Sequence, residues 1–202
     1  MTIRRGQDWG APGEVPTGTA VAEDDAGLFV LLNSPEPPQT VAVCAGDLAR
    51  TVSASSDPQH YGTGNTVVIA PLDLLEVEYD GGAAVCVSHV VARRSWLWGT
   101  VLVVANAQFL GRWDIAPRSH PNDGRFDATE VSVSMSVRQR LIAARRLPTG
   151  SHLPHPDLIQ QRSTSSEWTF ARPLTLWLDG VRVGRTKALR VRVVPDALTV
   201  CI

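Results

Sequence analysis

Residues 101–131, which read VLVVANAQFLGRWDIAPRSHPNDGRFDATEV, decide the fold. The apolar run 101–106 has no polar side to face water, so it predicts a strand in the middle of a sheet. A polar loop with two prolines follows, and it closes on the acidic turn 123–127 (DGRFD) as an alternating strand begins. This arrangement of strand, rigid loop and strand would fix two carboxylates and several backbone carbonyls in one place.

Short strand candidates fill the chain from Thr66 onward. Turn signals such as Asp80-Gly81-Gly82 and Asp179-Gly180 separate them. One helix interrupts the series at 137–147, with Val137, Leu141, Ile142 and Ala144 on one side. A single helix cannot cover a parallel, doubly wound sheet. Residues 66–202 are therefore predicted to be a mostly β domain, an antiparallel β-sandwich or barrel.

Residues 1–65 are rich in Gly, Pro and acidic side chains. They predict a small α/β or irregular N-terminal appendage, with a strand or short helix at 26–32, a strand at 41–44 and a short helix at 46–52. The total length of 202 residues fits one domain with such an appendage.

The formal net charge is −1, so bulk charge points to no nucleic-acid partner. The charges are unevenly placed, however: twelve acids and three arginines precede residue 81, whereas eleven bases and three acids occupy 138–192. Two surfaces of opposite sign follow from this. They either face each other, face a partner chain, or bind an anion.

The three cysteines, Cys44, Cys86 and Cys201, are odd in number and have no metal-binding spacing. They are predicted to be buried free thiols in a reducing cytosol. The N-terminus lacks the apolar segment of a signal peptide, and no stretch approaches the roughly 18 apolar residues of a membrane span. We therefore expect a cytoplasmic protein without a transmembrane segment, with peripheral contact to a membrane left open.

Several motifs resemble those of the bacterial diacylglycerol kinase-like lipid kinases. Residues 106–127, with Gly111, Ala116-Pro117 and the turn 123–127, resemble that family's Asn-Gly-x-Tyr-x-Gly-Gly, Ala-Pro and Asp-Gly-x-Leu-Asp sequence. Residues 173–198 resemble its "hydrophobic–Asp-Gly-Glu … Val-x-Pro-x-Ala-Leu" ending, and 74–89 resemble its opening strand pair. The resemblance covers about residues 66–202 and implies the family's C-terminal β-sandwich domain.

The resemblance also implies a second domain, of which this chain keeps little. The family's N-terminal α/β domain holds ATP phosphates in a Gly-Gly-Asp-Gly-Thr loop, and that loop does not occur here. Residues 44–51 (CAGDLART) are similar to the Gly-Thr-x-Asn-Asp-Phe-Ala-Arg-Thr segment that ends that domain. The nucleotide-binding domain is thus expected to be reduced to a remnant within 1–65, without a recognisable ATP site.

Two sets of site residues follow from the resemblance. The family's Asp-Gly-Glu hairpin supplies a general base, but here it reads Asp179-Gly180-Val181, and valine cannot accept a proton. Asp179 would have to act as the catalytic residue, or it simply forms a turn. The family's loop also binds a structural Mg²⁺. Carried over, the Mg²⁺ or Ca²⁺ ligands are the carbonyl of His120, the side chain of Asp123 and the carbonyl of Arg125.

The expected function is that of a lipid-kinase-related β-sandwich protein without kinase activity of its own. It would bind a lipid, a phosphorylated small molecule or a partner chain. The alternatives are an acceptor-site subunit whose ATP-binding domain is a separate protein, and a structural homodimer. Trp96 and Trp98, beside Arg93 and Arg94, either form an aromatic and cationic rim for a ligand or membrane, or plug the end of the sandwich. His89 lies on an apolar strand, where a core histidine is expected more often than a catalyst.

Overall fold

The computed structural model describes residues 9–151 and 155–202. Its strands are β1 (Ala11–Glu14), β2 (Ala20–Ala22), β3 (Thr40–Val43), β4 (Thr66–Tyr79), β5 (Gly82–Cys86), β6 (His89–Arg93), β7 (Val101–Ala105), β8 (Phe109–Leu110), β9 (Trp113–Asp114), β10 (Phe126–Val131), β11 (Leu158–Ser163), β12 (Ser165–Leu178) and β13 (Val181–Cys201). The helices are α1 (Asp25–Leu32), α2 (Gly46–Val52) and α3 (Val137–Arg146), with 3₁₀ turns at Pro58–Tyr61 and Leu147–Thr149.

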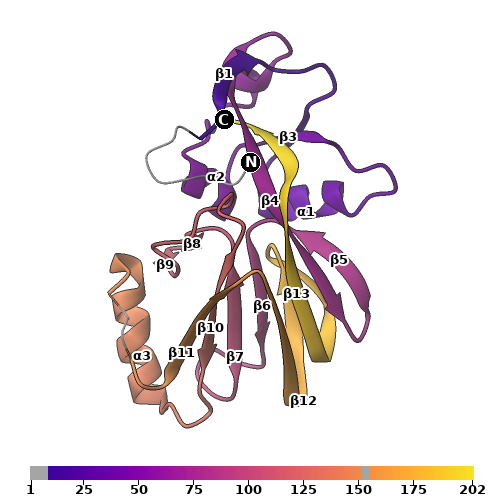
Figure 1. The fold of residues 1–202 in the computed structure, drawn as a ribbon. Helices are drawn as coiled ribbons and strands as arrows, with labels where there is room; N and C mark the ends of the chain where they lie inside the picture. Colours follow the sequence, from indigo (N-terminus) through magenta and orange to yellow (C-terminus); the bar gives the residue numbers. More distant parts are fainter. Residues whose placement is uncertain (1–8, 152–154) are drawn as a thin grey trace.

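The protein is mostly β and its main sheet is open. The sheet has eleven strands, and its main path runs β1-β4-β13-β12-β6-β7-β10-β11, with β5 beside β4 and β3 beside β13 (Figure 1). Apart from β2 and β3 with their parallel contacts, the pairs of this sheet are antiparallel. This confirms the predicted antiparallel β-sandwich class. Because the path ends at two edges, β1 and β11, the sheet is not a barrel.

The central apolar run of the sequence is the most buried strand. All five residues of β7 are buried, and β7 lies between β6 and β10. One face of β7 joins the main core through Leu102 and Val104. The other face, with Val101 and Val103, packs under Ile115, Ala116 and neighbouring side chains. Burial on both faces explains why this strand has no alternation in its sequence.

The N-terminal region shares its core with the ends of the two longest strands. Strands β2 and β3 are parallel and are connected through helix α1. Strand β3 also pairs in parallel with the end of β13, where Val41 lies opposite Val200. Buried residues of α1 and α2 pack with Leu72 of β4 and Leu198 of β13. The segment 26–32, predicted to be strand or helix, is helix α1, and the predicted helix at 46–52 is α2.

Two strand boundaries differ from the prediction. The expected strands 66–70 and 74–79 are one continuous strand, β4, which passes through Pro71. Pro71 pairs opposite Thr199, beside a register shift in β13, so the missing N–H falls at an irregular part of the ladder. The expected strand 83–92 is instead divided into β5 and β6, because Asp179 binds the backbone N–H groups of residues 87–89.

Helix α3 is oriented with its arginine inward. Val137, Leu141 and Ile142, the predicted apolar side, are 45%, 49% and 41% exposed, whereas Arg140 is buried. The amphipathic pattern therefore predicted the helix correctly. Val137 and Ile142 of that side face solvent, however, while Leu141 and Ala144 line a cavity instead of packing in the core. Arg140 can be buried because its guanidinium donates to four backbone carbonyls, from residues 96, 99, 132 and 135.

Opposite charges meet on the β4, β13 and β12 strands. Arg190 contacts Glu167 at 2.7 Å and Glu78 at 3.5 Å, and Arg192 pairs with Glu76. Part of the acidic first half is thus neutralised by the basic second half on a solvated face. The three cysteines are free thiols, as predicted, with Cys86 and Cys201 buried and Cys44 half-buried. Within residues 9–151 and 155–202, no helix has the length and apolarity needed to cross a membrane.

Candidate functional site

A hollow of about 440 Å³, with carboxylates on part of its wall and apolar and aromatic side chains on the rest, lies where the N-terminal helices meet the sheet. Asp25 at the start of α1, Asp47 in α2 and Asp179 in the β12–β13 turn line it together with Ser88 and His89. We call these five residues the acidic cluster. Segments separated by more than 150 residues therefore bring three carboxylates to one place, among them the predicted catalytic Asp179.

The carboxylate of Asp179 holds the bend between β5 and β6. Its Oδ2 accepts from the backbone N–H of Val87 at 2.8 Å, and its Oδ1 accepts from Ser88 at 2.8 Å and His89 at 2.9 Å. Asp179 and Gly180 both have positive φ, at 46° and 82°, as a tight Asp-Gly hairpin requires. Burial, with a smaller contribution from the Asp25 carboxylate, raises the pKa of Asp179 to about 7, against the effect of the three N–H donors.

Asp25 and Asp47 connect helices α1 and α2 to each other and to the sheet. Asp25 accepts from the backbone N–H of Asp47 and of Leu48, the latter at 3.0 Å, and so caps α2 from another element. It also accepts from the hydroxyl of Ser88 at 2.6 Å. Gly46 is required here, because a Cβ at this position would lie 2.1 Å from Asp25 Oδ2.

Asp47 is the carboxylate of the cluster with the most open oxygen. Its Oδ1 accepts from the N–H of Gly111 at 2.7 Å, and its Oδ2 lies 3.8 Å from Nδ1 of His89. Burial and the Asp25 charge raise the pKa of Asp47 to about 6. His89 is 2% exposed, and burial lowers its pKa to about 4, so it is a neutral histidine at physiological pH. Its burial agrees with the expected core histidine, but Nε2 has no hydrogen-bond partner among the described residues, so the side chain is not fully satisfied.

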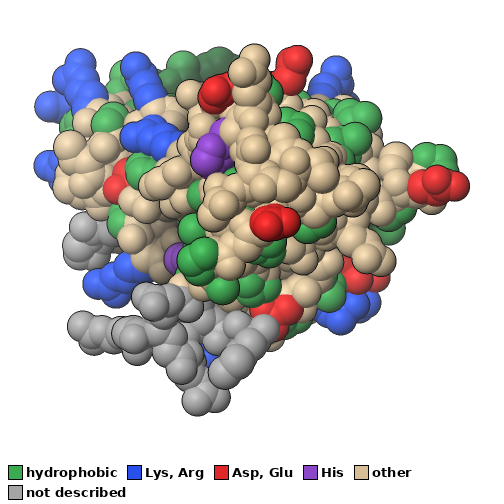
Figure 2. Space-filling view, turned by 90° about the horizontal axis from the view of Figure 1, so that it is seen from above, with side chains coloured by type: hydrophobic (Ala, Val, Ile, Leu, Met, Phe, Trp, Pro, Cys, Tyr) green, Lys and Arg blue, Asp and Glu red, His purple; other side chains and the backbone are tan. Residues whose placement is uncertain are grey.

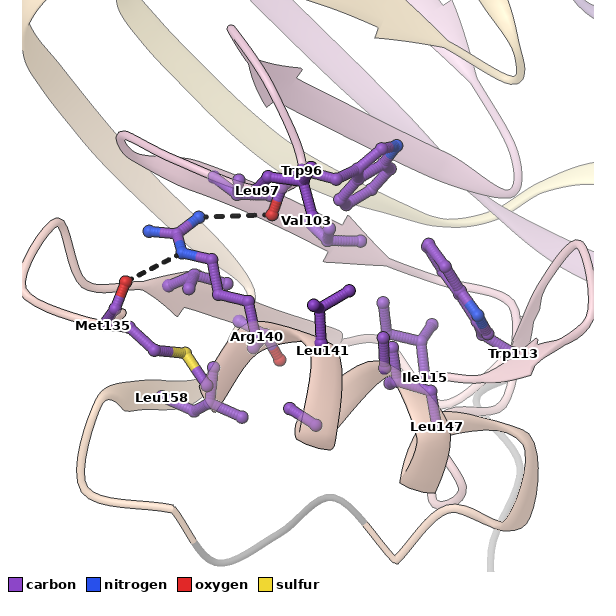
Figure 3. Close-up of a pocket in the computed structure, with 15 residues that line it drawn as sticks. Trp96, Leu97, Val103, Trp113, Ile115, Met135, Arg140, Leu141, Leu147 and Leu158 are labelled. Carbon is purple, nitrogen blue, oxygen red and sulfur yellow. Dashed lines mark hydrogen bonds between the residues drawn. The ribbon is translucent and has the colours of Figure 1, made fainter. Parts of the chain in front are cut away.

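A second, apolar cavity of about 270 Å³ lies between α3 and the sheet (Figure 3). Apart from Thr129 and Arg140, its lining side chains are apolar or aromatic; they include Val101, Val103, Trp113, Ile115, Leu141 and Leu147. The cavity exists because the inward side of α3 carries the small residues Ala143 and Ala144 opposite the sheet. Its chemistry suits a hydrocarbon chain.

Trp96 belongs to the walls of both cavities. Its ring stacks edge-on against Trp113, 5.1 Å away, on the side of the apolar cavity. On the other side the guanidinium of Arg93 lies 4.5 Å from the Trp96 ring and 4.3 Å from that of Trp177. The hollow that contains the acidic cluster and the apolar cavity therefore share the Trp96 side chain in their walls.

The two tryptophans of the predicted rim have different roles. Trp96 is half-buried and lines both cavities, so it does not fill the end of the sandwich as the plug interpretation expected. Trp98, two residues later, is 57% exposed. The two side chains were predicted to act together, whereas Trp96 is half-buried and Trp98 faces solvent.

The predicted cation loop is held by protein groups. Asp123 forms an ion pair with Arg162, and its Oδ1 accepts from the N–H of Arg125 at 3.0 Å. The carbonyl of His120 accepts from the N–H of Asp123 at 3.2 Å. Asp73 beneath the loop accepts from the N–H of Gly124 at 2.7 Å.

In this arrangement the loop does not offer a free carboxylate to a metal, because the Arg162 guanidinium neutralises Asp123. Among the described residues, no three His, Cys, Asp or Glu side chains are grouped to hold a metal ion. The predicted ligand set depends on two carbonyls, so Mg²⁺ or Ca²⁺ binding by His120, Asp123 and Arg125 stays a prediction. It would require Arg162 to leave Asp123.

The comparisons with known proteins agree with this geometry. A family model described as the YegS C-terminal NAD kinase beta sandwich-like domain matches residues 75–202. The chain belongs to this family. The expected relation to the diacylglycerol kinase-like lipid kinases is thereby confirmed for the β-sandwich. No curated protein matches the chain in sequence.

Solved structures show the same fold. A "putative diacylglycerol kinase" from Bacillus anthracis str. Sterne has a TM-score of 0.64 at 12% identity, and the match covers 89% of this chain and 76% of that one. A second structure, of a diacylglycerol kinase from the same organism, has a TM-score of 0.58 at 13% identity, with 89% and 74% covered. Since residues 66–202 are only about two thirds of this chain, the shared fold extends into the region before residue 66.

Sequence reasoning missed part of the site of this YegS-type domain. Asp47 lies in the segment 44–51 that carried the resemblance, but it was not singled out as a site residue. Asp25 and Ser88 belong to no recognised motif. The only sequence signal for Asp25 is the Asp24-Asp25 pair that precedes an apolar helix. The acidic cluster depends on contacts between α1, α2 and β6 that no local pattern specifies.

Proposed function

We propose that this chain is a lipid-kinase-related β-sandwich protein that binds a lipid and does not phosphorylate it on its own. The polar head of the lipid would lie at the acidic cluster and its acyl part in the apolar cavity. The observation that carries the proposal is the contact of both cavities with Trp96. A ligand that occupies both must be polar at one end and apolar at the other.

The acidic cluster favours a hydroxyl-bearing head over a phosphorylated one. Carboxylates accept hydrogen bonds from hydroxyl groups, but their negative charge opposes a phosphate. The hollow also contains Arg93, whose guanidinium is held against the Trp96 and Trp177 rings. Asp47 Oδ2 is positioned to accept such a bond. Of the two ligand classes expected from the sequence, an uncharged lipid with free hydroxyls, such as a diacylglycerol, fits better than a phosphorylated metabolite.

Three observations support the absence of independent kinase activity. The sequence contains no Gly-Gly-Asp-Gly-Thr loop. Val181 occupies the position of the expected general base, and its side chain packs against the main core. Asp179 uses both carboxylate oxygens to hold residues 87–89. Phosphoryl transfer relies on positioning and neutralising the phosphates, so a missing phosphate loop removes more than one part of the machinery.

Lipid binding is tested by extracting the purified protein and analysing the extract by mass spectrometry, together with titration of a water-soluble short-chain diacylglycerol. Ala144→Phe places a ring in the apolar cavity and should abolish binding. Ala171→Phe, at an exposed position of β12, is the matched control and should bind normally. Equal binding by the protein and the Ala144→Phe variant would show that the cavity is not the lipid site.

The acceptor-site subunit is the second candidate function, and Asp47 favours it. A base needs an oxygen within reach of the substrate and a raised pKa, and Asp47 has both, with a pKa of about 6. Both oxygens of Asp179 are instead occupied by backbone N–H donors. A separate chain carrying Gly-Gly-Asp-Gly-Thr would then supply ATP. Adding such a partner should allow phosphorylation of diacylglycerol, and Asp47→Asn should abolish it. If no co-purifying partner gives turnover, this candidate function is ruled out.

A further inference from the structure

Apolar side chains surround the open side of the apolar cavity and face solvent. Leu97 and Leu141 line the cavity and are 37% and 49% exposed. Beside them, Trp98 is 57% and Val137 is 45% exposed, and Ile142 lies next on the helix at 41%. We call these five residues the apolar rim. Monomeric proteins rarely leave such side chains together in water without a binding role.

Arg140 ties the two parts of the apolar rim into one unit. Its Nη2 donates to the carbonyl of Gly99 at 2.6 Å and to that of Ser132 at 2.8 Å, and its Nε donates to Met135 at 3.1 Å. Figure 3 shows this side chain reaching from α3 to Met135 and to Trp96 on the opposite segment. The loop with Leu97 and Trp98 is thus fixed to α3.

The segments that carry the rim are basic. Residues 93–113 and 131–151 contain seven arginines and no Asp or Glu. Arg138, Arg145 and Arg146 lie on the exposed half of α3, interleaved with Val137, Leu141 and Ile142. Figure 2 shows Lys and Arg side chains mainly at the left of the molecule seen from above, with a few on the right.

These arginines are not neutralised by the described residues. Within 9–151 and 155–202, no carboxylate lies at ion-pair distance from Arg138, Arg145 or Arg146. Asp157 lies near the start of α3, but it accepts hydrogen bonds from Ser134 at 3.0 Å and Gln139 at 3.4 Å. The surface around the apolar rim therefore carries the unpaired positive charge of these three arginines, in contrast to the paired Arg190 and Arg192 of β13.

We infer that the apolar rim and the exposed arginines of α3 form a docking surface for an anionic lipid bilayer, which places the mouth of the apolar cavity at the membrane. This inference rests on the proposed lipid binding. A helix with apolar and basic side chains on its exposed half inserts the apolar ones at the headgroup boundary, while the arginines reach lipid phosphates. A second copy of this chain fits this surface less well, because the same three arginines would surround its own apolar rim and repel the first set.

The test is co-sedimentation with vesicles of phosphatidylglycerol and phosphatidylcholine in equal amounts, against vesicles of phosphatidylcholine alone. The triple variant Arg138→Gln, Arg145→Gln, Arg146→Gln should lose about a hundredfold in partitioning to the anionic vesicles, since each arginine near such a surface contributes about fivefold. Trp98→Ser with Ile142→Ser should reduce partitioning to them as well. High salt should weaken the binding of the unmodified protein to the anionic vesicles.

A matched control removes three exposed charges elsewhere: Arg172→Gln, Arg185→Gln, Lys187→Gln on β12 and β13. It should partition like the unmodified protein, and an equal loss in both triple variants would overturn the inference in favour of net charge alone. Binding to neither vesicle type, or capture by an acidic protein surface only, would also overturn it.

The two proposals fail separately in this design. Ala144→Phe should dock to anionic vesicles normally but bind no short-chain diacylglycerol. The triple arginine variant should bind short-chain diacylglycerol normally but fail to dock. If the unmodified protein docks to anionic vesicles but binds no diacylglycerol, the proposed function fails. If it binds diacylglycerol but does not dock, the docking surface fails.

Discussion

The guanidinium of Arg140 donates a hydrogen bond of 2.6 Å to the carbonyl of Gly99, across the gap between α3 and the sheet. This contact makes a basic residue the anchor of α3 and leaves its larger apolar side chains in solvent. It also keeps the helix close to the sheet without filling the space between them. The apolar cavity and the exposed rim follow from the same contact.

Arg140→Met should destabilise the protein by about 2–4 kcal/mol, because the carbonyls of Gly99 and Ser132 would lose their buried donor. Urea unfolding followed by tryptophan fluorescence measures the change. Arg138→Met, on the exposed side of the same helix, should stay within about 0.5 kcal/mol of the unmodified protein. Equal stability of all three proteins would mean that the Arg140 bonds do not hold α3.

Asp179→Asn should destabilise the protein most at acidic pH and least above neutral pH. The pKa of Asp179 is raised to about 7 in the fold, so its contribution to stability is present below the unfolded pKa of about 4 and is lost as the pH rises toward 7. The asparagine does not titrate. Unfolding free energies of both proteins at pH 5 and about pH 8 give the comparison. A difference that grows with pH would contradict the raised pKa.

Val181→Glu should not turn the chain into a kinase. The substitution restores the family's hairpin sequence, but no phosphate loop is present to hold ATP. Incubation with radiolabelled ATP and diacylglycerol should yield no phosphatidic acid. Phosphorylation by the variant alone would show that a nucleotide site exists outside the recognised motifs.

Arg162→Gln should raise the affinity of the loop for Ca²⁺ or Mg²⁺, because it frees the Asp123 carboxylate. Isothermal titration calorimetry with each ion measures the effect. Asp123→Asn in the same background should remove the binding. If neither the unmodified protein nor Arg162→Gln binds either ion, the carried-over set of His120, Asp123 and Arg125 is not a metal site.

The pattern of the sequence was sufficient for most of the fold. The apolar run that forms β7 and the Asp-Gly turns predicted a central strand and tight hairpins, because burial and positive φ act locally. The side that α3 buries could not be predicted. The periodicity of Val137, Leu141 and Ile142 describes a helix with an apolar side, but the carbonyls that receive Arg140 come from another segment.

The candidate site was predictable in part. Asp179 was found from the hairpin motif, but its three N–H partners at residues 87–89 arise from a bend that splits a predicted strand. Asp25 caps a helix to which it is not adjacent in sequence, so no spacing rule identifies it. The apolar cavity depends on the absence of side-chain volume at Ala143 and Ala144, which no motif marks.

β4 and β13 pass without interruption from the sandwich into the N-terminal region, where Leu72 and Leu198 complete its core. Heat or denaturant should therefore melt both regions in a single cooperative transition, and amide exchange should protect β3 as strongly as the middle of β13. A protease cut near residue 65 would release no separately folded half. The acidic cluster, which draws its carboxylates from both regions, should therefore be lost in the same transition as the two long strands.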